Sequence, residues 1–124
     1  VLTKAVLLAT GNDYRKLGLE NEDEFTGRGI HFCATCDGPF YRNKTVAIVG
    51  GGDSAVQAAI EMSMISQKVY LLVRSRIRAA EIVAKRMYEK ENIEDYLKCR
   101  FNFDSGCGYR SGIFSRGGRR WWTV

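Results

Sequence analysis

The sequence predicts an α/β fold built around a parallel β-sheet, and three observations support this prediction. Residues 45–49 and 68–73 are short, apolar and rich in β-forming residues, as expected of strands that are buried on both faces. Residues 53–65 repeat alanine, valine and methionine at helical spacing, so the three segments form a strand–helix–strand unit. Three glycines at residues 50–52 provide the turn between the first strand and the helix.

Further elements are predicted on both sides of this unit. Residues 2–9 are apolar enough for another buried strand, whereas residues 20–29 are acidic and contain glycine, which favours a solvated surface. A second helix is predicted over residues 79–91, with one side formed by Ile82, Val83, Arg86 and Met87.

The bulk composition is typical of one globular domain. The chain has 124 residues, of which 45% are hydrophobic and 27% charged, and its net charge of +5 suits a phosphate-bearing partner. No apolar stretch approaches the roughly 20 residues that span a bilayer, and no basic and apolar leader is present, so we expect a cytoplasmic protein without a membrane partner. Because an apolar run begins at Val1, we also expect the chain to be part of a longer protein.

Residues 95–124 differ from the rest of the chain. They are rich in glycine, arginine and serine, follow neither the helical nor the strand period, and end in two tryptophans before Thr123. One hypothesis is a shift of reading frame, because moving the codons of Asp95 and Tyr96 by one base gives isoleucine or threonine. An alternative of another class is a basic nucleic-acid-binding module that uses the arginines and tryptophans of this tail. We expect that the chain binds no nucleic acid.

The glycine turn has the spacing of a dinucleotide-binding motif. Gly50, Gly52 and Ala55 form G-x-G-x-x-A between a strand and a helix, which is the context that the motif requires. Glycines let backbone N–H groups approach a pyrophosphate, which then lies at the positive end of the helix. The alternative is a plain turn that lets strand and helix pack. The motif favours a Rossmann-like, three-layer nucleotide-binding domain.

Arginines follow the second predicted strand, where an NAD-binding chain would offer an acid to the ribose. Arg74, Arg76 and Arg78 can instead bind a 2′-phosphate through charge-assisted hydrogen bonds. This pattern favours NADPH over NADH. The alternative is that the arginines form a solvated face of the next helix.

Cys33 and Cys36 form a C-x-x-C pair, for which three roles are conceivable. A zinc site needs about four ligands, and the remaining candidates, His31, Cys99 and Cys107, are few and poorly spaced. A structural disulfide would close too small a loop to restrain the unfolded chain strongly. A C-x-x-C pair near a strand–helix–strand unit favours a redox-active dithiol. Asp37 follows the pair and is placed either to exchange a proton or to stabilise the start of a helix.

The chain resembles the NADPH-binding domain of the low-molecular-weight thioredoxin reductases. The resemblance covers residues 1 to about 94 and rests on "LLATG", "GRGIHFCATCDGPFY", "VAIVGGGDSAVQAA" and "VYLLVRSRIRA" in the family's order. It implies a homodimeric flavoprotein in which NADPH reduces FAD, FAD reduces the dithiol, and the dithiol reduces thioredoxin.

The resemblance also implies a role for each matching residue. Cys36 would face the flavin, Cys33 would attack the partner disulfide, and Asp37 would be the acid or base. The residues that match the cofactor-binding motifs are Gly50, Gly51, Gly52, Asp53, Ser54, Ala55, Arg74, Ser75 and Arg78. The family's basic motif is His-Arg-Arg with a further arginine about four residues on, whereas this chain has Val73-Arg74-Ser75 with Arg78. Ser75 therefore also suggests an alternative: a related flavin disulfide oxidoreductase with a different electron donor or acceptor.

The resemblance divides the chain into three parts. Residues 1–12 would be a remnant of the FAD-binding domain with its linker, residues 13–94 a truncated NADPH-binding domain, and residues 95–124 the atypical tail. Because the FAD-binding half is not in this sequence, we expect the isolated chain to bind NADPH weakly and not to turn over.

Overall fold

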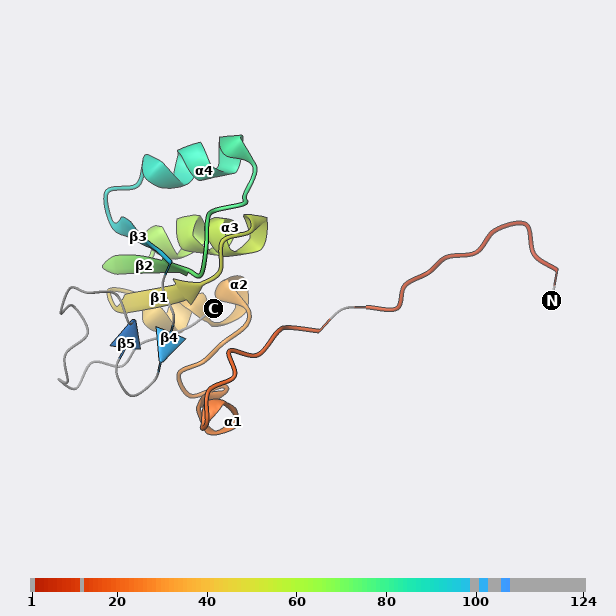
Figure 1. The fold of residues 1–124 in the computed structure, drawn as a ribbon, viewed down its shortest axis with the longest axis horizontal. Coiled ribbons are helices and arrows are strands. Elements are labelled where there is room, and N and C mark those ends of the chain that lie inside the picture. Colours follow the sequence, from red (N-terminus) through yellow and green to blue (C-terminus); the bar gives the residue numbers. More distant parts are fainter. Residues whose placement is uncertain (1, 12, 99–100, 103–105, 108–124) are drawn as a thin grey trace.

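The structure is a computed structural model that describes residues 2–11, 13–98, 101–102 and 106–107. Its centre is a three-stranded parallel sheet in the order β1-β2-β3 (Figure 1). The strands are β1 (Thr45–Val49), β2 (Lys68–Val73) and β3 (Ile93–Leu97). The helices are α1 (Glu22–Phe25), α2 (Ala34–Asp37), the 3₁₀ helix η1 (Gly38–Tyr41), α3 (Asp53–Ser63) and α4 (Glu81–Tyr88).

The three strands form two parallel pairs with a defined register. Thr45 lies opposite Lys68 at the start of the β1–β2 pair, and Val49 lies opposite Leu72 near its end. Val69 lies opposite Ile93 in the β2–β3 pair. Each parallel pair is joined by a helical crossover, α3 in the first case and α4 in the second, as parallel strands require. The predicted α/β fold with a parallel sheet is therefore confirmed.

The main hydrophobic core lies between the sheet and α3. Alternate strand residues face the helices because successive side chains of a strand point to opposite faces. The fully or almost fully buried members of this core from the strands and helices are Val46, Ile48, Val56, Ala59, Met62, Val69, Leu71, Val73 and Met87. On the other face, Ala47 and Leu72 are each only 2% exposed. Burial on both faces explains why the strands are apolar throughout.

The predicted boundaries agree closely with the structure for this unit. Both predicted strands have the observed bounds, and the first helix ends at Ser63 rather than at residue 65. The second helix is shorter than predicted, and its inward side is only partly the predicted one. Met87 is buried and Val83 half-buried, whereas Ile82 is 72% exposed and Arg86 is also exposed.

The prediction of a buried strand over residues 2–9 is wrong for this chain. These residues form no regular element and extend away from the sheet in Figure 1. Leu2 and Leu7 are almost fully exposed, and Val6 and Leu8 are exposed as well. A buried strand needs a neighbouring strand to pair with and a layer to cover it, and the described part of the chain places neither beside this segment.

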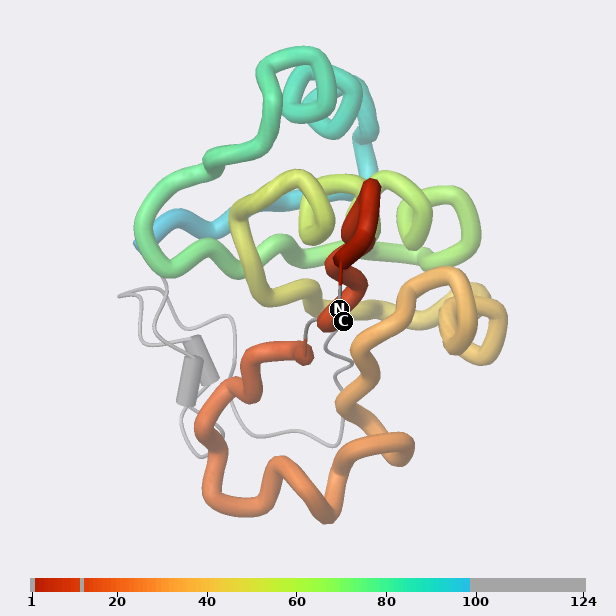
Figure 2. The backbone as a smooth tube through the Cα atoms, turned by 90° about the vertical axis from the view of Figure 1, so that its right-hand side faces the viewer, coloured from red at the N-terminus to blue at the C-terminus, as the bar shows by residue number. Residues whose placement is uncertain are grey.

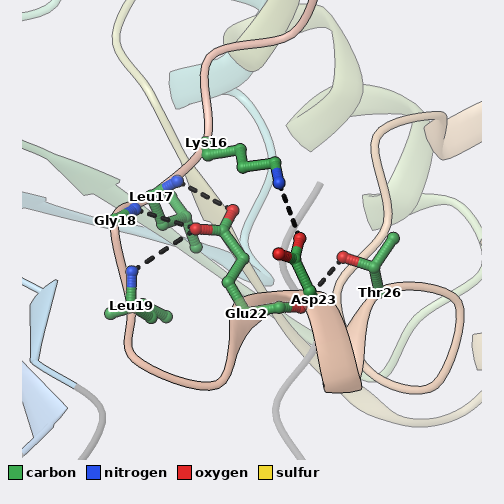
Figure 3. Close-up of polar contacts among 7 residues, drawn as sticks. All are labelled: Lys16, Leu17, Gly18, Leu19, Glu22, Asp23 and Thr26. Carbon is green, nitrogen blue, oxygen red and sulfur yellow. Dashed lines mark hydrogen bonds and ion pairs between the residues drawn. The ribbon is translucent and has the colours of Figure 1, made fainter.

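The acidic segment 20–29 is not solvated throughout, because Glu22 is only 3% exposed. Its carboxylate accepts backbone N–H bonds from Leu17 at 2.8 Å, from Gly18 at 2.8 Å and from Leu19 at 3.4 Å (Figure 3). Gly18 has a positive φ of 78°, which lets the chain bend around the carboxylate. The neighbouring Asp23 instead pairs at the surface with Lys16 at 2.6 Å. Glu22 thus anchors the segment that leads to the C-x-x-C pair.

Figure 2 shows this anchored segment as an orange loop that lies on the opposite side of the molecule from α4 and returns to the sheet at α2. Beyond the sheet, β4 (Phe101–Asn102) pairs antiparallel with β5 (Gly106–Cys107).

β3 continues past residue 94, which is the predicted end of the NADPH-binding domain. The frame-shift hypothesis and the nucleic-acid-binding alternative concern residues 95–124, most of which lie outside the described residues.

Candidate functional site

Cys33 and Cys36 form a disulfide at the start of α2, with their Cα atoms 5.3 Å apart. Cys33 is the N-cap residue of this short helix, and its Sγ accepts the backbone N–H of Cys36 at 3.2 Å. The backbone N–H of Asp37 bonds to the carbonyl oxygen of Cys33 at 3.1 Å. An N–H directed at sulfur stabilises negative charge there, which is the form in which a cysteine acts as a nucleophile.

The two cysteines of the pair differ in exposure. Cys33 is half-buried and Cys36 is exposed in this chain. In the described part of the chain, Cys36 is therefore accessible from outside. The adjacent Pro39 and Phe40 are exposed too, and Phe40 is 71% exposed.

Asp37 belongs to a chain of three polar side chains beside the disulfide. Its Oδ2 lies 3.0 Å from Nδ1 of His31, and Nε2 of His31 lies 2.9 Å from the hydroxyl of Tyr41. His31 and Tyr41 are buried, whereas the side chain of Asp37 is 34% exposed. Burial raises the pKa of Tyr41, and the charge of Asp37 raises it further.

The glycine turn joins β1 to α3, and its three glycines differ in the space around them. Gly50 has a φ of 149°, and a Cβ at this position would lie 2.7 Å from Cβ of Ala55. A Cβ on Gly51 would lie 2.7 Å from Cγ1 of Val73 and 2.8 Å from the carbonyl oxygen of Arg76. At Gly52, by contrast, a Cβ would meet nothing within 4 Å. The first two glycines are therefore needed for packing, and the third leaves open space at the start of α3.

The loop after β2 lies directly against this turn. The backbone N–H of Arg78 donates to the carbonyl of Gly51 at 2.5 Å, and that of Ala80 donates to Oδ1 of Asp53 at 2.8 Å. Asp53 therefore fastens the loop to the helix. Arg74, Ser75, Arg76 and Arg78 are exposed.

The arrangement fits a phosphate-bearing dinucleotide. Four N–H groups of the first turn of an α-helix have no partner within the helix, and those of α3 begin beside the open space at Gly52. Ser54 and Ala55 belong to this turn, and the exposed arginines of the adjacent loop carry the positive charge. A pyrophosphate and a further phosphate have suitable donors here.

The disulfide and the glycine turn lie at opposite ends of α3. Oγ1 of Thr35 in α2 donates to Oε2 of Glu61 at 3.1 Å, near the last turn of α3. Gly38 lets the start of η1 lie close to α3, since a Cβ there would lie 2.9 Å from Sδ of Met62. The helical rise places Glu61 about 12 Å from Asp53 along the axis. The two sites are therefore distinct and lie at the two ends of α3.

Among the described side chains, no group of three histidine, cysteine, aspartate or glutamate residues is placed to hold a metal ion. Of the zinc ligands considered from the sequence, His31 bonds to Asp37 and Tyr41 instead, and Cys99 lies outside the described residues. In the described part of the chain, no helix is long and apolar enough to cross a membrane.

Sequence reasoning missed the roles of His31 and Tyr41. They lie two residues before Cys33 and at the end of η1, in positions that share no helical or strand period. The available signal was a single histidine next to a C-x-x-C pair that is followed by an acid. Only the turn of α2 and η1 brings these residues together.

Comparisons with known proteins agree with this site. A family profile described as pyridine nucleotide-disulphide oxidoreductase matches residues 1–106. The thioredoxin reductase of Escherichia coli O157:H7 is 48% identical over 111 residues, which are 88% of this chain and 35% of that protein.

Solved structures give the same result. The thioredoxin reductase of Lactococcus lactis superposes with a TM-score of 0.69 at 39% identity, over 72% of this chain and 30% of that one. A ferredoxin-flavin thioredoxin reductase from Clostridium acetobutylicum gives a TM-score of 0.52 at 30% identity, over 72% of this chain and 30% of that one.

The chain spans about a third of the length of the curated relatives that it matches. The relatives confirm the resemblance drawn from the C-x-x-C and glycine motifs. The family description itself joins a pyridine nucleotide to disulfide chemistry, which are the two functions that the glycine turn and the Cys33–Cys36 disulfide suit. On the match over residues 1–106, the chain belongs to the pyridine nucleotide-disulphide oxidoreductase family.

Proposed function

We propose that this chain forms the nucleotide-binding and disulfide-bearing part of an NADPH-dependent thioredoxin-disulfide reductase. The observation that carries the proposal is the placement of a C-x-x-C disulfide and an open glycine turn at opposite ends of one helix, α3. The names of two matching relatives, both thioredoxin reductases, support thioredoxin as the acceptor. The similarity to a ferredoxin-flavin thioredoxin reductase supports a flavin as the intermediate carrier, for which FAD is proposed.

The division of the chain follows from this role. Residues 13–94 are proposed to be the NADPH-binding domain, and residues 1–12 to belong with an FAD-binding domain outside this sequence. The exposed apolar side chains of Leu2 and Leu7 support the second assignment, because they are of the type that a larger protein buries. The whole enzyme is proposed to be a cytoplasmic homodimer.

The cofactor-binding role is assigned to the two adjoining loops. Gly50, Gly51 and Gly52 bring the backbone close to the pyrophosphate, and the N–H groups of the first turn of α3 donate to it. Arg74 and Arg78, with Ser75 between them, are proposed to bind the 2′-phosphate of NADPH. Asp53 acts indirectly, because its carboxylate already holds the backbone of Ala80 and so fixes the basic loop. When bound, NADPH would supply a hydride, and FAD would supply the two electrons that reduce the Cys33–Cys36 disulfide.

The dithiol step uses this chain's own residues. The Cys33 thiolate attacks one sulfur of the thioredoxin disulfide, so that a mixed disulfide forms and one thioredoxin thiolate leaves. Cys36 then gives its proton to Asp37 and attacks Sγ of Cys33. The Cys33–Cys36 bond forms, the mixed disulfide breaks, and a second thioredoxin thiolate leaves. Two electrons have passed to thioredoxin, and the two thiolates take up protons from Asp37 and solvent.

A related enzyme with a different electron donor is the second candidate. Ser75 stands where the thioredoxin reductases that this chain resembles carry an arginine, and the similarity to a ferredoxin-flavin thioredoxin reductase supports the same alternative. The two candidates differ in what the glycine turn and the basic loop bind.

Nucleotide titration of the full chain tests the donor. We expect NADPH to bind more tightly than NADH by about tenfold, which corresponds to about 1.4 kcal/mol for one charge-assisted contact. Arg74→Ala should remove this preference, and Arg42→Ala, which replaces an exposed arginine after η1, should keep it. Equal affinities for NADPH and NADH would favour the different donor. Absence of binding for either nucleotide would overturn the assignment of a nicotinamide cofactor.

A further inference from the structure

His31 is a buried histidine that joins the redox helix to the element after it. Its ring lies between Asp37 at the end of α2 and Tyr41 at the end of η1, and its side chain is 8% exposed. A buried imidazole with a polar partner on each ring nitrogen has a fixed orientation. The partner on the redox side is the acid that the proposed dithiol step uses.

The direction of the two hydrogen bonds follows from the chemistry of their ends. The ionised carboxylate of Asp37 only accepts, so Nδ1 of His31 carries the proton and donates to Oδ2 at 3.0 Å. Tyr41 remains a phenol, since burial and the nearby Asp37 charge raise its pKa. Its O–H therefore donates to Nε2 of His31 at 2.9 Å. The chain of donors points from the buried phenol to the half-exposed carboxylate.

The buried end of this chain is held on several sides. Tyr41 is 6% exposed, and its carbonyl oxygen accepts the hydroxyl of Ser66 at 3.5 Å. The ammonium group of Lys44 lies 5.3 Å from the centre of its ring. The ring of His31 also packs against that of Tyr41, with 5.4 Å between the centroids. The tyrosine is thus a rigid support for the histidine, which in turn orients a carboxylate that would otherwise rotate in solvent.

We propose that His31 is a positioning residue, supported by Tyr41, that holds the Asp37 carboxylate in place to take the proton of Cys36 during disulfide exchange. The inference rests on the proposed function, since it gives Asp37 its role in the second step. Oδ2 is occupied by the histidine, and Oδ1 is the atom that we assign to the proton. As this proton arrives, the Cys36 sulfur bonds to Sγ of Cys33 and the mixed disulfide breaks.

Two substitutions of His31 separate positioning from mere packing. The side-chain N–H₂ of asparagine takes the place of Nδ1, so His31→Asn keeps a donor to Asp37 and loses the partner of Tyr41. Glutamine places its terminal group near Nε2, so His31→Gln keeps a partner for Tyr41 and loses the donor to Asp37. A structural role would penalise both, whereas a positioning role predicts that asparagine rescues and glutamine does not.

The experiment uses the full chain with Cys99→Ser and Cys107→Ser, so that only the Cys33–Cys36 pair reacts. The reduced chain is mixed with 5,5′-dithiobis(2-nitrobenzoate). The first thionitrobenzoate released reports attack by Cys33, and the second reports closure of the disulfide by Cys36. The urea midpoint of each variant is measured in parallel.

We expect Asp37→Asn to slow the second release by about a hundredfold, the lower end for loss of a proton acceptor. His31→Gln should slow it by about tenfold, whatever its urea midpoint, since 1.4 kcal/mol of orientation corresponds to a factor of ten. His31→Asn should slow it by no more than about threefold, because it loses only the support of Tyr41. Tyr41→Phe leaves the side chains of His31 and Asp37 in place but removes the hydroxyl that donates to His31. It should slow the second release by about threefold, the effect of one net hydrogen bond.

The outcomes distinguish the proton role of Asp37 from the positioning role of His31. If Asp37→Asn leaves the second release unchanged, the proton role in the proposed function is overturned and the positioning role with it. If Asp37→Asn is slow but His31→Gln reacts at the parent rate, only the role of His31 is overturned. Equal slowing by His31→Asn and His31→Gln would show a packing effect and would likewise overturn it. An unchanged rate for Tyr41→Phe would overturn the support assigned to the tyrosine.

Discussion

Replacing Glu22 by glutamine should destabilise the segment that leads to the redox pair, although the two side chains have the same shape. The carboxylate accepts three backbone N–H groups in a site that is 3% exposed. Glutamine has one acceptor oxygen, which can keep the N–H groups of Gly18 and Leu19. Its N–H₂ group would then face the N–H of Leu17, so that two donors oppose each other at a site where the present distance is 2.8 Å.

The magnitude follows from these contacts. Loss of a hydrogen bond to a charged group costs about 1.5–3 kcal/mol, and a buried donor without a partner costs about 1–3 kcal/mol. Because the two costs share one N–H group, we expect about 3 kcal/mol rather than their sum. The matched control is Asp23→Asn, which removes a surface ion pair whose aspartate side chain is 81% exposed. Such an exposed pair contributes little to stability, because solvent screens both charges.

Urea unfolding of the full chain, followed by circular dichroism, measures the global effect, and amide hydrogen exchange at Leu17 and Gly18 measures the local one. A local loss of 3 kcal/mol accelerates exchange at these amides by about two powers of ten. If Glu22→Gln changes neither the urea midpoint nor the exchange at Leu17 by more than Asp23→Asn does, the carboxylate does not anchor the segment and the reasoning is refuted.

Three further predictions concern the nucleotide turn and the titrating groups. Gly51→Ala should lower the free energy of unfolding by about 1–3 kcal/mol, because its Cβ meets the Arg76 carbonyl oxygen at 2.8 Å. Gly52→Ala should change the free energy of unfolding by less than about 1 kcal/mol and should weaken NADPH binding. Urea unfolding and nucleotide titration of both variants test this, and a larger loss of stability for Gly52→Ala than for Gly51→Ala would contradict the assignment. Hydrogen bonds from Tyr96 and Lys68 lower the pKa of Glu94. Their contribution to stability is therefore present above the ordinary glutamate pKa and is lost as the pH falls through the lowered pKa. Urea unfolding of Glu94→Gln should show a shallower loss of stability in acid, and an unchanged slope would count against this cause. Burial raises the pKa of Tyr41. The contribution of the neutral phenol to stability is therefore complete below about pH 10 and is lost as the pH rises toward the raised pKa. Tyr41→Phe should flatten the alkaline loss of stability in urea unfolding, and an equally steep loss would contradict this cause.

The strand–helix–strand unit could be predicted from sequence because its signals are local. Apolar runs define β1 and β2, the alanine-rich period defines α3, and the glycines define the turn between them. The motif context also located the basic loop, since the carboxyl ends of parallel strands meet at one edge of a sheet. The close approach of Gly51 to that loop explains why a glycine is needed at this position.

What could not be predicted depends on contacts between distant residues or on partners outside the chain. Glu22 has the appearance of one acid among several, and its burial results from three N–H groups that only the folded loop presents. His31 meets Asp37 and Tyr41 through the turn of two short helices, which leaves no periodic trace. The apolar residues 2–9 have the composition of a strand, but composition does not reveal whether a neighbouring strand is present.

Capture of the mixed disulfide with thioredoxin tests the central claim most directly. The full chain with Cys99→Ser and Cys107→Ser is reduced, freed of reductant and mixed with oxidised thioredoxin, and covalent adducts are identified by non-reducing electrophoresis and intact mass. The freed thioredoxin thiol is alkylated as it forms, which prevents it from reversing the reaction. We predict that Cys36→Ser then accumulates a one-to-one adduct through Cys33, because the second cysteine is no longer there to release the partner. Cys33→Ser should give none. An adduct with Cys33→Ser in equal yield, or no adduct with Cys36→Ser, would contradict the account.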